Sequence, residues 1–439
     1  MGRQPAWLKE SARQIFLATL AQLDLRLAVA RKVVRTRDRL LLEDTTLELS
    51  RYRDILVISF GKAAWAMATA LRDILEPSFP THGVAVSNAP PKTELPGFAI
   101  FVGGHPYPNG QSLAAAEAIL AALAKTDEKT LVFFLISGGG SALVEKPLEP
   151  LTLEDLRAVN QALVTCGARI EEMNAIRKHL SEVKGGRLAQ AAVRAQQVTL
   201  LISDVPEGKL ATIASGPTLP DPSTVEDCYA VASRYRLLER FPPRVRRLFG
   251  ERKLVETPKA EAEVFARGRV VLLLSSRDVL HAAHKAAAGF GFATECDMSA
   301  DDWELEPAAD YLLARLRALQ GAAGRQPVCL ISGGELSSPV TGTGQGGRNQ
   351  AFVLTCVPKI AGHAVAVLSA GTDGIDGNSP AAGAVADGET LARAREQGME
   401  VGDYLERSDS YRFFEALGDA VVTGPQQNNL RDLRLLLAS

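Results

Sequence analysis

Residues 131–143 read LVFFLISGGGSAL, an apolar run of strand length that is followed directly by glycines. The related stretch LISGGELS occupies residues 330–337, so the pattern occurs twice in the chain. A run that is apolar throughout is typical of a strand whose two faces are both covered by helices. The pattern therefore predicts two α/β sheets. It is compatible both with an internal duplication and with two independent glycine turns at strand ends.

Further apolar runs of strand length lie on both sides of this stretch. In the first half of the chain these runs are residues 55–60, 83–86, 98–102 and 198–202. Helical patterns lie between several of them, at residues 62–75, 111–125, 152–165 and 171–193, after a long amphipathic helix over residues 7–33. Strand-like runs resume at residues 270–274, 328–331, 364–369 and 420–422. Strands that alternate with helices predict mostly parallel sheets.

The gap between the two sets of strands predicts a domain boundary. Prolines interrupt the helical signals there, at Pro242, Pro243 and Pro258. We therefore expect two α/β/α domains, each with a mostly parallel central sheet. The N-terminal, Rossmann-like domain is expected over residues 1–250 and the C-terminal α/β domain over residues 265–439.

Composition excludes several other classes of protein. The formal net charge of −2 lacks the basic excess of a protein that binds nucleic acid. The apolar runs are much shorter than the roughly 20 residues of a membrane-spanning helix, so no membrane partner is expected. The five cysteines form no CxxC pair, which argues against a zinc site and a disulfide framework. Without a signal-peptide core near the first helix, a cytoplasmic location is expected.

Four glycine-containing segments have the character of phosphate-binding turns: SFGKAAWAMA (59–68), ISGGGSAL (136–143), ISGGE (331–335) and GTGQGGRNQA (342–351). Glycine turns expose backbone N–H groups, and the dipole of a following helix favours an anion. The residues expected to bind substrate or nucleotide in these turns are Gly61, Ser137, Gly138, Gly139, Gly140, Ser141, Gly333, Gly334, Gly344, Gly346, Gly347 and Asn349.

Two cations accompany these turns. Lys62 follows Gly61 at the start of a helical pattern, and Arg348 follows Gly347 in the same way. A positive charge at a helix N-terminus is unfavourable for the helix. It is explained if an anion binds there, so we expect both side chains to act on one anionic ligand between the domains. The alternative is that both are exposed and merely tolerated.

Acidic residues also follow the predicted strands. Asp204, Glu335 and Asp373 are expected to bind substrate and, through water, Mg²⁺, or to accept a proton from an attacking hydroxyl. Each acid could instead cap a helix or a loop. The sequence leaves the roles of two histidines undecided: His105 in the turn GGHPYPNG and His179 in a helical pattern. Each could form a hydrogen bond in the cleft between the domains or have a structural role.

Seven stretches between residues 55 and 390 resemble the class II glycerate kinases, which carry a C-terminal domain of the MOFRL type. They are FGKAAWAM, GGHPYPNGQS, LISGGGSALVEKP, RKHLSEVKGGRLA, SDVPEGKLATIASGPTLPDPST, ISGGELSSPVTGTGQGGRNQ and SAGTDGIDGNSPAAGAVAD. The resemblance implies transfer of the ATP γ-phosphoryl group to D-glycerate with Mg²⁺, giving 2-phosphoglycerate, in a cleft between the two domains. It places the family's catalytic lysine on Lys62 and its catalytic arginine on Arg348.

The chain departs from the family pattern at residues 423–429, which read TGPQQNN where relatives have a TGPTGTN-like turn. Two alternatives to the kinase stay open. One is an NAD(P)H-dependent hydroxypyruvate reductase that uses the GxGxxG match at 342–347, although no acid follows about 20 residues on to bind a ribose. The other is a non-catalytic metabolite-binding relative. In each case the partners expected are small molecules, and the protein acts as a monomer or homodimer.

Overall fold

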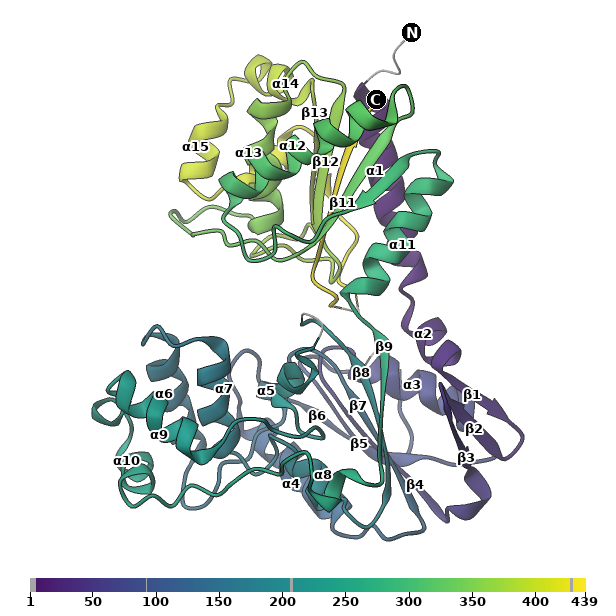
Figure 1. Ribbon diagram of the computed structural model, residues 1–439, viewed down its shortest axis with the longest axis vertical. Coiled ribbons are helices and arrows are strands. Elements are labelled where there is room, and N and C mark those ends of the chain that lie inside the picture. Colours follow the sequence, from purple (N-terminus) through teal and green to yellow (C-terminus); the bar gives the residue numbers. More distant parts are fainter. Residues whose placement is uncertain (1–4, 92, 206–207, 427–428) are drawn as a thin grey trace. The chain divides into compact units, whose positions relative to one another are not determined.

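The computed structural model describes residues 5–91, 93–205, 208–426 and 429–439 (Figure 1). The chain divides into two compact units. The first unit runs from Leu25 to Leu273, and the second combines the residues up to Asp24 with Leu274–Ser439. Each unit contains a six-stranded sheet with helices, so the α/β class predicted from the sequence is confirmed.

The sheet of the first unit has the strand order β6-β5-β4-β7-β8-β9. Its strands are β4 (Asp54–Phe60), β5 (His82–Ser87), β6 (Phe98–Val102), β7 (Thr130–Ile136), β8 (Gln196–Ile202) and β9 (Gly268–Leu274). The pairs β5–β6, β4–β5, β4–β7 and β7–β8 are parallel, as expected. Numbered along the chain the order is 3-2-1-4-5-6, which reverses between β4 and β7. Ligands of such sheets bind beyond the carboxyl ends of the strands at this reversal.

Helices pack on this sheet because its strands are apolar on both faces. Every residue of β7 is buried, and Val132, Phe134 and Ile136 join Ile119 and Leu123 of α4 in one cluster. The helices of the first unit are α2 (Leu25–Lys32), α3 (Ala64–Leu75), α4 (Gly110–Leu123), α5 (Gly140–Leu143), α6 (Leu153–Val164), α7 (Ile170–His179), α8 (Arg187–Ala191), α9 (Val225–Arg234) and α10 (Pro243–Gly250). Helices α6, α7, α9 and α10 share a second apolar cluster.

The sheet of the second unit is mixed, with the order β10-β11-β15-β12-β13-β14. Its strands are β10 (Ala293–Cys296), β11 (Val328–Gly334), β12 (Val365–Gly371), β13 (Gly383–Asp387), β14 (Ala420–Val421) and β15 (Asp432–Ala438). Strand β15 lies between β11 and β12 and is antiparallel to both, and β13 is antiparallel to β12. The expectation of a mostly parallel second sheet is therefore wrong. The antiparallel strands are β13 and β15, two segments that the sequence analysis left unassigned.

Helices of the second unit cover this sheet. They are α1 (Pro5–Gln22), α11 (Ser276–Gly289), α12 (Leu305–Ala323), α13 (Arg348–Ile360), α14 (Thr390–Glu396), α15 (Val401–Glu406) and α16 (Ser410–Ala416). Phe352 and Val357 of α13 are buried in one apolar cluster with Leu436 of β15 and Leu312 of α12. None of the helices in the described part of the chain combines the length and the apolar character needed to cross a membrane.

The structure differs from the expected domain limits at two places and from the expected helices at one. Helix α1 packs against α11 and β12, so it lies in the second unit and not with residues 25–250. The single helix expected over 7–33 is split into α1 and α2, and residues 33–48 form a small antiparallel sheet of β1 (Val33–Thr36), β2 (Arg39–Leu42) and β3 (Thr45–Glu48). Strand β9 completes the first sheet, although the second domain was expected from residue 265.

Candidate functional site

In the first unit, two predicted glycine turns pack against each other at the carboxyl ends of β4 and β7. Gly61 has a φ of +125°, and a Cβ there would lie 2.2 Å from Ser137 Oγ, so only glycine fits. The backbone N–H of Lys62 donates to the carbonyl of Gly138 at 3.0 Å, and the N–H of Ala63 donates to Ser137 Oγ at 3.0 Å. These contacts fix Lys62 at the point where the strand order reverses.

Three chemically active side chains surround the turn at Gly138 and Gly139. A Cβ on Gly138 would lie 2.2 Å from Asp204 Oδ2. A Cβ on Gly139 would lie 3.2 Å from His105 Cδ2 and 3.4 Å from Lys62 Cγ. The predicted residues Lys62 and Asp204 are therefore brought to one glycine turn, and His105 joins them. The signal for His105 in the sequence was its position in a turn rich in glycine and proline.

The protonation of His105 is biased by its surroundings. Partial burial lowers the pKa of His105, and the positive charge of Lys62 lowers it further. A neutral imidazole is thus favoured beside a charged lysine. This arrangement can present a cation, a hydrogen-bonding ring nitrogen and a carboxylate to one anionic ligand.

The predicted binding residues Gly140 and Ser141 lie in the short helix α5, behind this turn. Ser141 Oγ lies 2.9 Å from Ser215 Oγ, and the carbonyl of Ser141 accepts from Lys184 Nζ at 2.9 Å. Lys184 also forms a buried ion pair with Glu145. Through these internal contacts, Ser141 helps to hold the turn in place.

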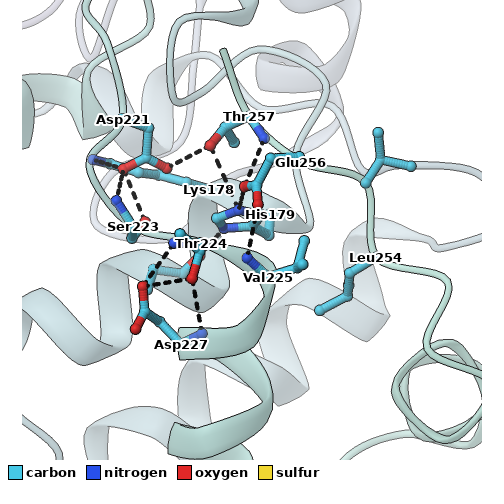
Figure 2. Close-up of polar contacts among 12 residues, drawn as sticks. Lys178, His179, Asp221, Ser223, Thr224, Val225, Asp227, Leu254, Glu256 and Thr257 are labelled. Carbon is cyan, nitrogen blue, oxygen red and sulfur yellow. Dashed lines mark hydrogen bonds and ion pairs between the residues drawn. The ribbon is translucent and has the colours of Figure 1, made fainter. Parts of the chain in front are cut away.

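The stretch RKHLSEVKGGRLA of the first unit contributes Lys178 and His179 to a largely buried polar network (Figure 2). Lys178 Nζ pairs with Asp221 Oδ1 at 3.1 Å, and His179 Nε2 lies 2.8 Å from Glu256 Oε1. Although burial acts in the opposite direction, hydrogen bonds from Lys259 and His179 lower the pKa of Glu256 to about 2. His179 therefore ties the segment around Glu256 to α7, which supports the structural reading of this histidine.

In the second unit, Arg348 begins α13 and is bound by two carboxylates. Its Nε lies 2.6 Å from Asp432 Oδ2 and its Nη2 lies 3.3 Å from Asp432 Oδ1. Nη2 also lies 3.0 Å from Glu335 Oε1. Burial alone would lower the pKa of Arg348, but the hydrogen bond and charge of Asp432 raise it above its ordinary value. The sequence analysis missed Asp432, whose signal was an acid at the start of the apolar run LRLLLA.

The turn after β11 positions Glu335. Gly334 has a φ of +86°, and a Cβ there would lie 2.4 Å from Asp301 Oδ1. Asp301 accepts from the N–H of Glu335 at 2.9 Å and forms a bidentate pair with Arg431, with both contacts at 2.7 Å. The predicted residue Gly333 contributes its carbonyl as an acceptor for the buried Arg434. The positive φ and the close approach of Asp301 account for a glycine at position 334, and ligand binding by Gly333 and Gly334 stays a prediction.

Asp373, the third predicted acid, lies at the same sheet edge. A Cβ on Gly371 would lie 3.0 Å from Asp373 Oδ1 and 3.5 Å from Asp432 Oδ1. Glu335 and Asp373 thus belong to the second unit, whereas Asp204 belongs to the first. Across residues 5–91, 93–205, 208–426 and 429–439, no group of three His, Cys, Asp or Glu side chains could hold a metal ion by itself.

The glycine loop at 342–347 has internal partners for several of its N–H groups. Gly344 donates to the carbonyl of Arg407 at 3.0 Å, and Gly346 donates to Asn378 Oδ1 at 2.8 Å. A Cβ on Gly347 would lie 2.3 Å from Asp376 Oδ1. These glycines allow the loop to pack closely on two neighbouring segments, and their contacts lend no support to a phosphate cradle in the loop.

Asp376 caps helix α13, whose N-cap residue Gly347 has no side chain to do so. Its carboxylate accepts from the N–H of Asn349 at 3.1 Å and from the N–H of Gln350 at 2.8 Å. Burial nevertheless raises the pKa of Asp376 to about 7. Asn349 Oδ1 accepts from Ser369 Oγ at 2.6 Å, so this predicted binding residue is held inside the unit. The part of the loop at 427–428, within the departure from the family pattern, lies outside the described residues.

Comparisons with known proteins match one family to each half of the chain. Residues 11–250 match the family described as "Domain of unknown function (DUF4147)", and residues 328–432 match the MOFRL family. A protein of Agrobacterium vitis, named provisionally as a hydroxypyruvate reductase, is 38% identical over 444 residues, covering 98% of this chain and 95% of its own length. D-glycerate 2-kinase of Thermotoga maritima is 35% identical over 382 residues, covering 86% of this chain and 89% of its own length.

A solved structure extends the likeness to three dimensions. The crystal structure of glycerate kinase from Thermotoga maritima matches with a TM-score of 0.86 at 34% identity, covering 99% of this chain and 100% of that chain. With a DUF4147 domain followed by a MOFRL domain, the chain belongs to the glycerate kinase family of enzymes.

Proposed function

We propose that this protein transfers the γ-phosphoryl group of ATP to D-glycerate and forms 2-phosphoglycerate. The observation that carries the proposal is the position of Lys62 in a glycine-rich turn where the sheet order of the first unit reverses. Such a position is where doubly wound sheets bind phosphorylated ligands. The proposed substrate follows from the names of relatives, which are glycerate kinase and D-glycerate 2-kinase.

Lys62 and Arg348 would stabilise the charge of the transferring group. Phosphoryl transfer depends mainly on positioning and on electrostatic stabilisation, so two fixed cations are suitable groups. Because Lys62 and Arg348 belong to different units, we propose that the ligand is bound by both units in the catalytic complex. Asp204, next to the turn that holds Lys62, is the proposed acceptor of the glycerate hydroxyl proton.

Mg²⁺ would enter with the nucleotide. It usually binds through one or two carboxylates and the phosphates of a substrate, and it needs no cage of protein ligands. The oxygens of Asp373 and Asp432 beside Gly371 are of the type that Mg²⁺ prefers. We therefore propose Asp373 as a residue that would hold it, with Asp204 and Glu335 as the further acids of the site. Bound Mg²⁺ would neutralise charge on the phosphates.

The experiment that tests the proposal measures ADP release from ATP with D-glycerate and identifies the product by phosphorus NMR. Oxidation of NADH with hydroxypyruvate is measured in parallel. ADP release with 2-phosphoglycerate is expected. NADH oxidation without ADP release would instead identify a reductase, and ligand binding without either reaction would identify a non-catalytic relative. Cell fractionation and light scattering test the further parts of the proposal, a cytoplasmic protein that is a monomer or homodimer.

A further inference from the structure

We propose that Asp432 is the positioning residue that orients Arg348, and that Glu335 is an exchangeable partner that leaves Arg348 when the anionic substrate binds. This inference rests on the proposed kinase function. It assigns different roles to two carboxylates that contact the same guanidinium group.

Asp432 has the properties of a permanent anchor. Its side chain is only 3% exposed, and it contacts Arg348 through both carboxylate oxygens, at 2.6 and 3.3 Å. Paired contacts of this kind fix the plane of a guanidinium group as well as its distance. Asp432 is also the first residue of β15, in register with Gly334 on one side and Gly371 on the other. The backbone that carries this carboxylate is thus held by strands on both sides.

A second arginine adds to this anchor. Arg434 lies two residues along β15, so its side chain leaves the strand on the same face as that of Asp432. Arg434 is completely buried, and burial lowers its pKa to about 10 while the charge of Asp432 acts in the opposite direction. Asp432 therefore lies between two cations, one buried and one at the sheet edge, which favours its staying in place.

Glu335 has the properties of an exchangeable partner. Its side chain is 36% exposed, and its Oε1 lies 3.0 Å from Nη2 of Arg348. Ion pairs between exposed side chains are weak because water screens the two charges. Glu335 and an anionic substrate would compete for the same Nη2 group of Arg348. Glu335 is the carboxylate that can move away and leave Nη2 to the substrate.

The experiment compares steady-state kinetics of Asp432→Asn and Glu335→Gln with those of wild type. Misplacement of Arg348 in Asp432→Asn should lower kcat by about 10²-fold and change KM for glycerate much less. Glu335→Gln should lower KM for glycerate, because one competing charge is removed. Asp419→Asn is the matched control, since Asp419 is a buried carboxylate of the same unit that pairs with Arg393 and Lys9. Its kcat should equal that of wild type.

Chemical rescue gives a readout that a merely structural role would not change. Added guanidinium ion should restore part of the activity of Arg348→Ala, because Asp432 can hold the free ion in the place of the side chain. The double variant Arg348→Ala with Asp432→Asn should not be rescued. Equal rescue of the single and double variants would overturn the inference, as would a wild-type kcat in Asp432→Asn.

Two further results keep the test decisive. Where Asp432→Asn does not fold, Asp432→Glu keeps the charge but displaces it, and an unchanged kcat in this variant would contradict the anchor. A KM for glycerate in Glu335→Gln that equals or exceeds that of wild type would contradict the exchangeable partner. Wild type that releases no ADP with glycerate would refute the proposed function itself, whereas active wild type with unaffected variants would refute only this inference.

Discussion

Lys62 in the first unit and Arg348 in the second are held in place by different means. Backbone contacts hold the turn of Lys62: its N–H donates to the carbonyl of Gly138, and Gly61 packs directly on Ser137. Side-chain carboxylates hold Arg348, chiefly that of Asp432, which is 84 residues away in the sequence. The comparison teaches that a turn made of glycines can be recognised locally, whereas an ion pair between distant segments cannot.

The largest expected effect is the loss of either cation. Lys62→Ala and Arg348→Ala should each lower kcat by about 10³-fold or more, because each removes a charge from the transferring phosphoryl group. ADP release measures activity, and thermal unfolding checks that both variants fold. Full activity in one variant would contradict the proposal that both sites take part, because only one cation would then serve the reaction.

The backbone-held turn of Lys62 should not tolerate a methyl group added at Gly61. Gly61→Ala should lower the free energy of unfolding by about 1–3 kcal/mol or more, because the φ of +125° is strained and the new Cβ would meet Ser137 at 2.2 Å. Chemical denaturation measures this change. Gly167→Ala is the matched control in the same unit, since Gly167 has a φ of +80° but nothing within 4 Å of the added Cβ. Equal losses in both variants would show that the contact with Ser137 contributes nothing.

The helix that carries Arg348 should respond to pH through its cap. Burial raises the pKa of Asp376 from its ordinary value near 4 to about 7. A raised carboxyl pKa contributes stability that is present below about pH 4 and is lost as pH rises through about 7. Unfolding free energy measured between these pH values should therefore fall in wild type and fall less in Asp376→Asn. Parallel pH profiles of the two proteins would argue that Asp376 is ionised throughout the range.

The smallest effect is expected at the polar network of the first unit, and it has the opposite sign. Hydrogen bonds lower the pKa of Glu256 to about 2, so its contribution is present above about pH 4 and is lost as pH falls towards 2. Because Glu256 is 43% exposed, Glu256→Gln should cost less than about 1 kcal/mol at neutral pH. The acid unfolding midpoint measures it. A stability loss that persists unchanged at pH 2 would not come from this carboxylate.

Much of the first unit could be predicted from the sequence because its signals are local. Fully apolar runs marked β4, β5, β7 and β8 to within two residues at each end, and Gly61 with Lys62 marked the turn after β4. The second sheet was predicted less well. Strand β15 is buried throughout, yet nothing local shows that it inserts antiparallel between β11 and β12. Asp432 was missed for the same reason, since its partner is fixed only by that pairing.

The boundaries of the two units could not be predicted from local sequence patterns either. Helix α1 has apolar residues at helical spacing, and Leu8, Ile15 and Phe16 are completely buried. The pattern shows that one face must be covered but does not show by which sheet. The covering surface comes from residues more than 250 positions away, in α11 and β12.

The central place of β15 has a consequence for how the protein is made. A ribosome delivers residues 432–438 after every other strand of that sheet, so β11 and β12 emerge before the strand that separates them. Until β15 has been made, β11 and β12 each have one edge without a paired strand. The sheet surface on which α1 packs is also incomplete. The second unit should therefore complete its folding only after residues 432–438 have been made, while the first can fold earlier. Removing residues 432–438 would take away the middle of a sheet rather than its border.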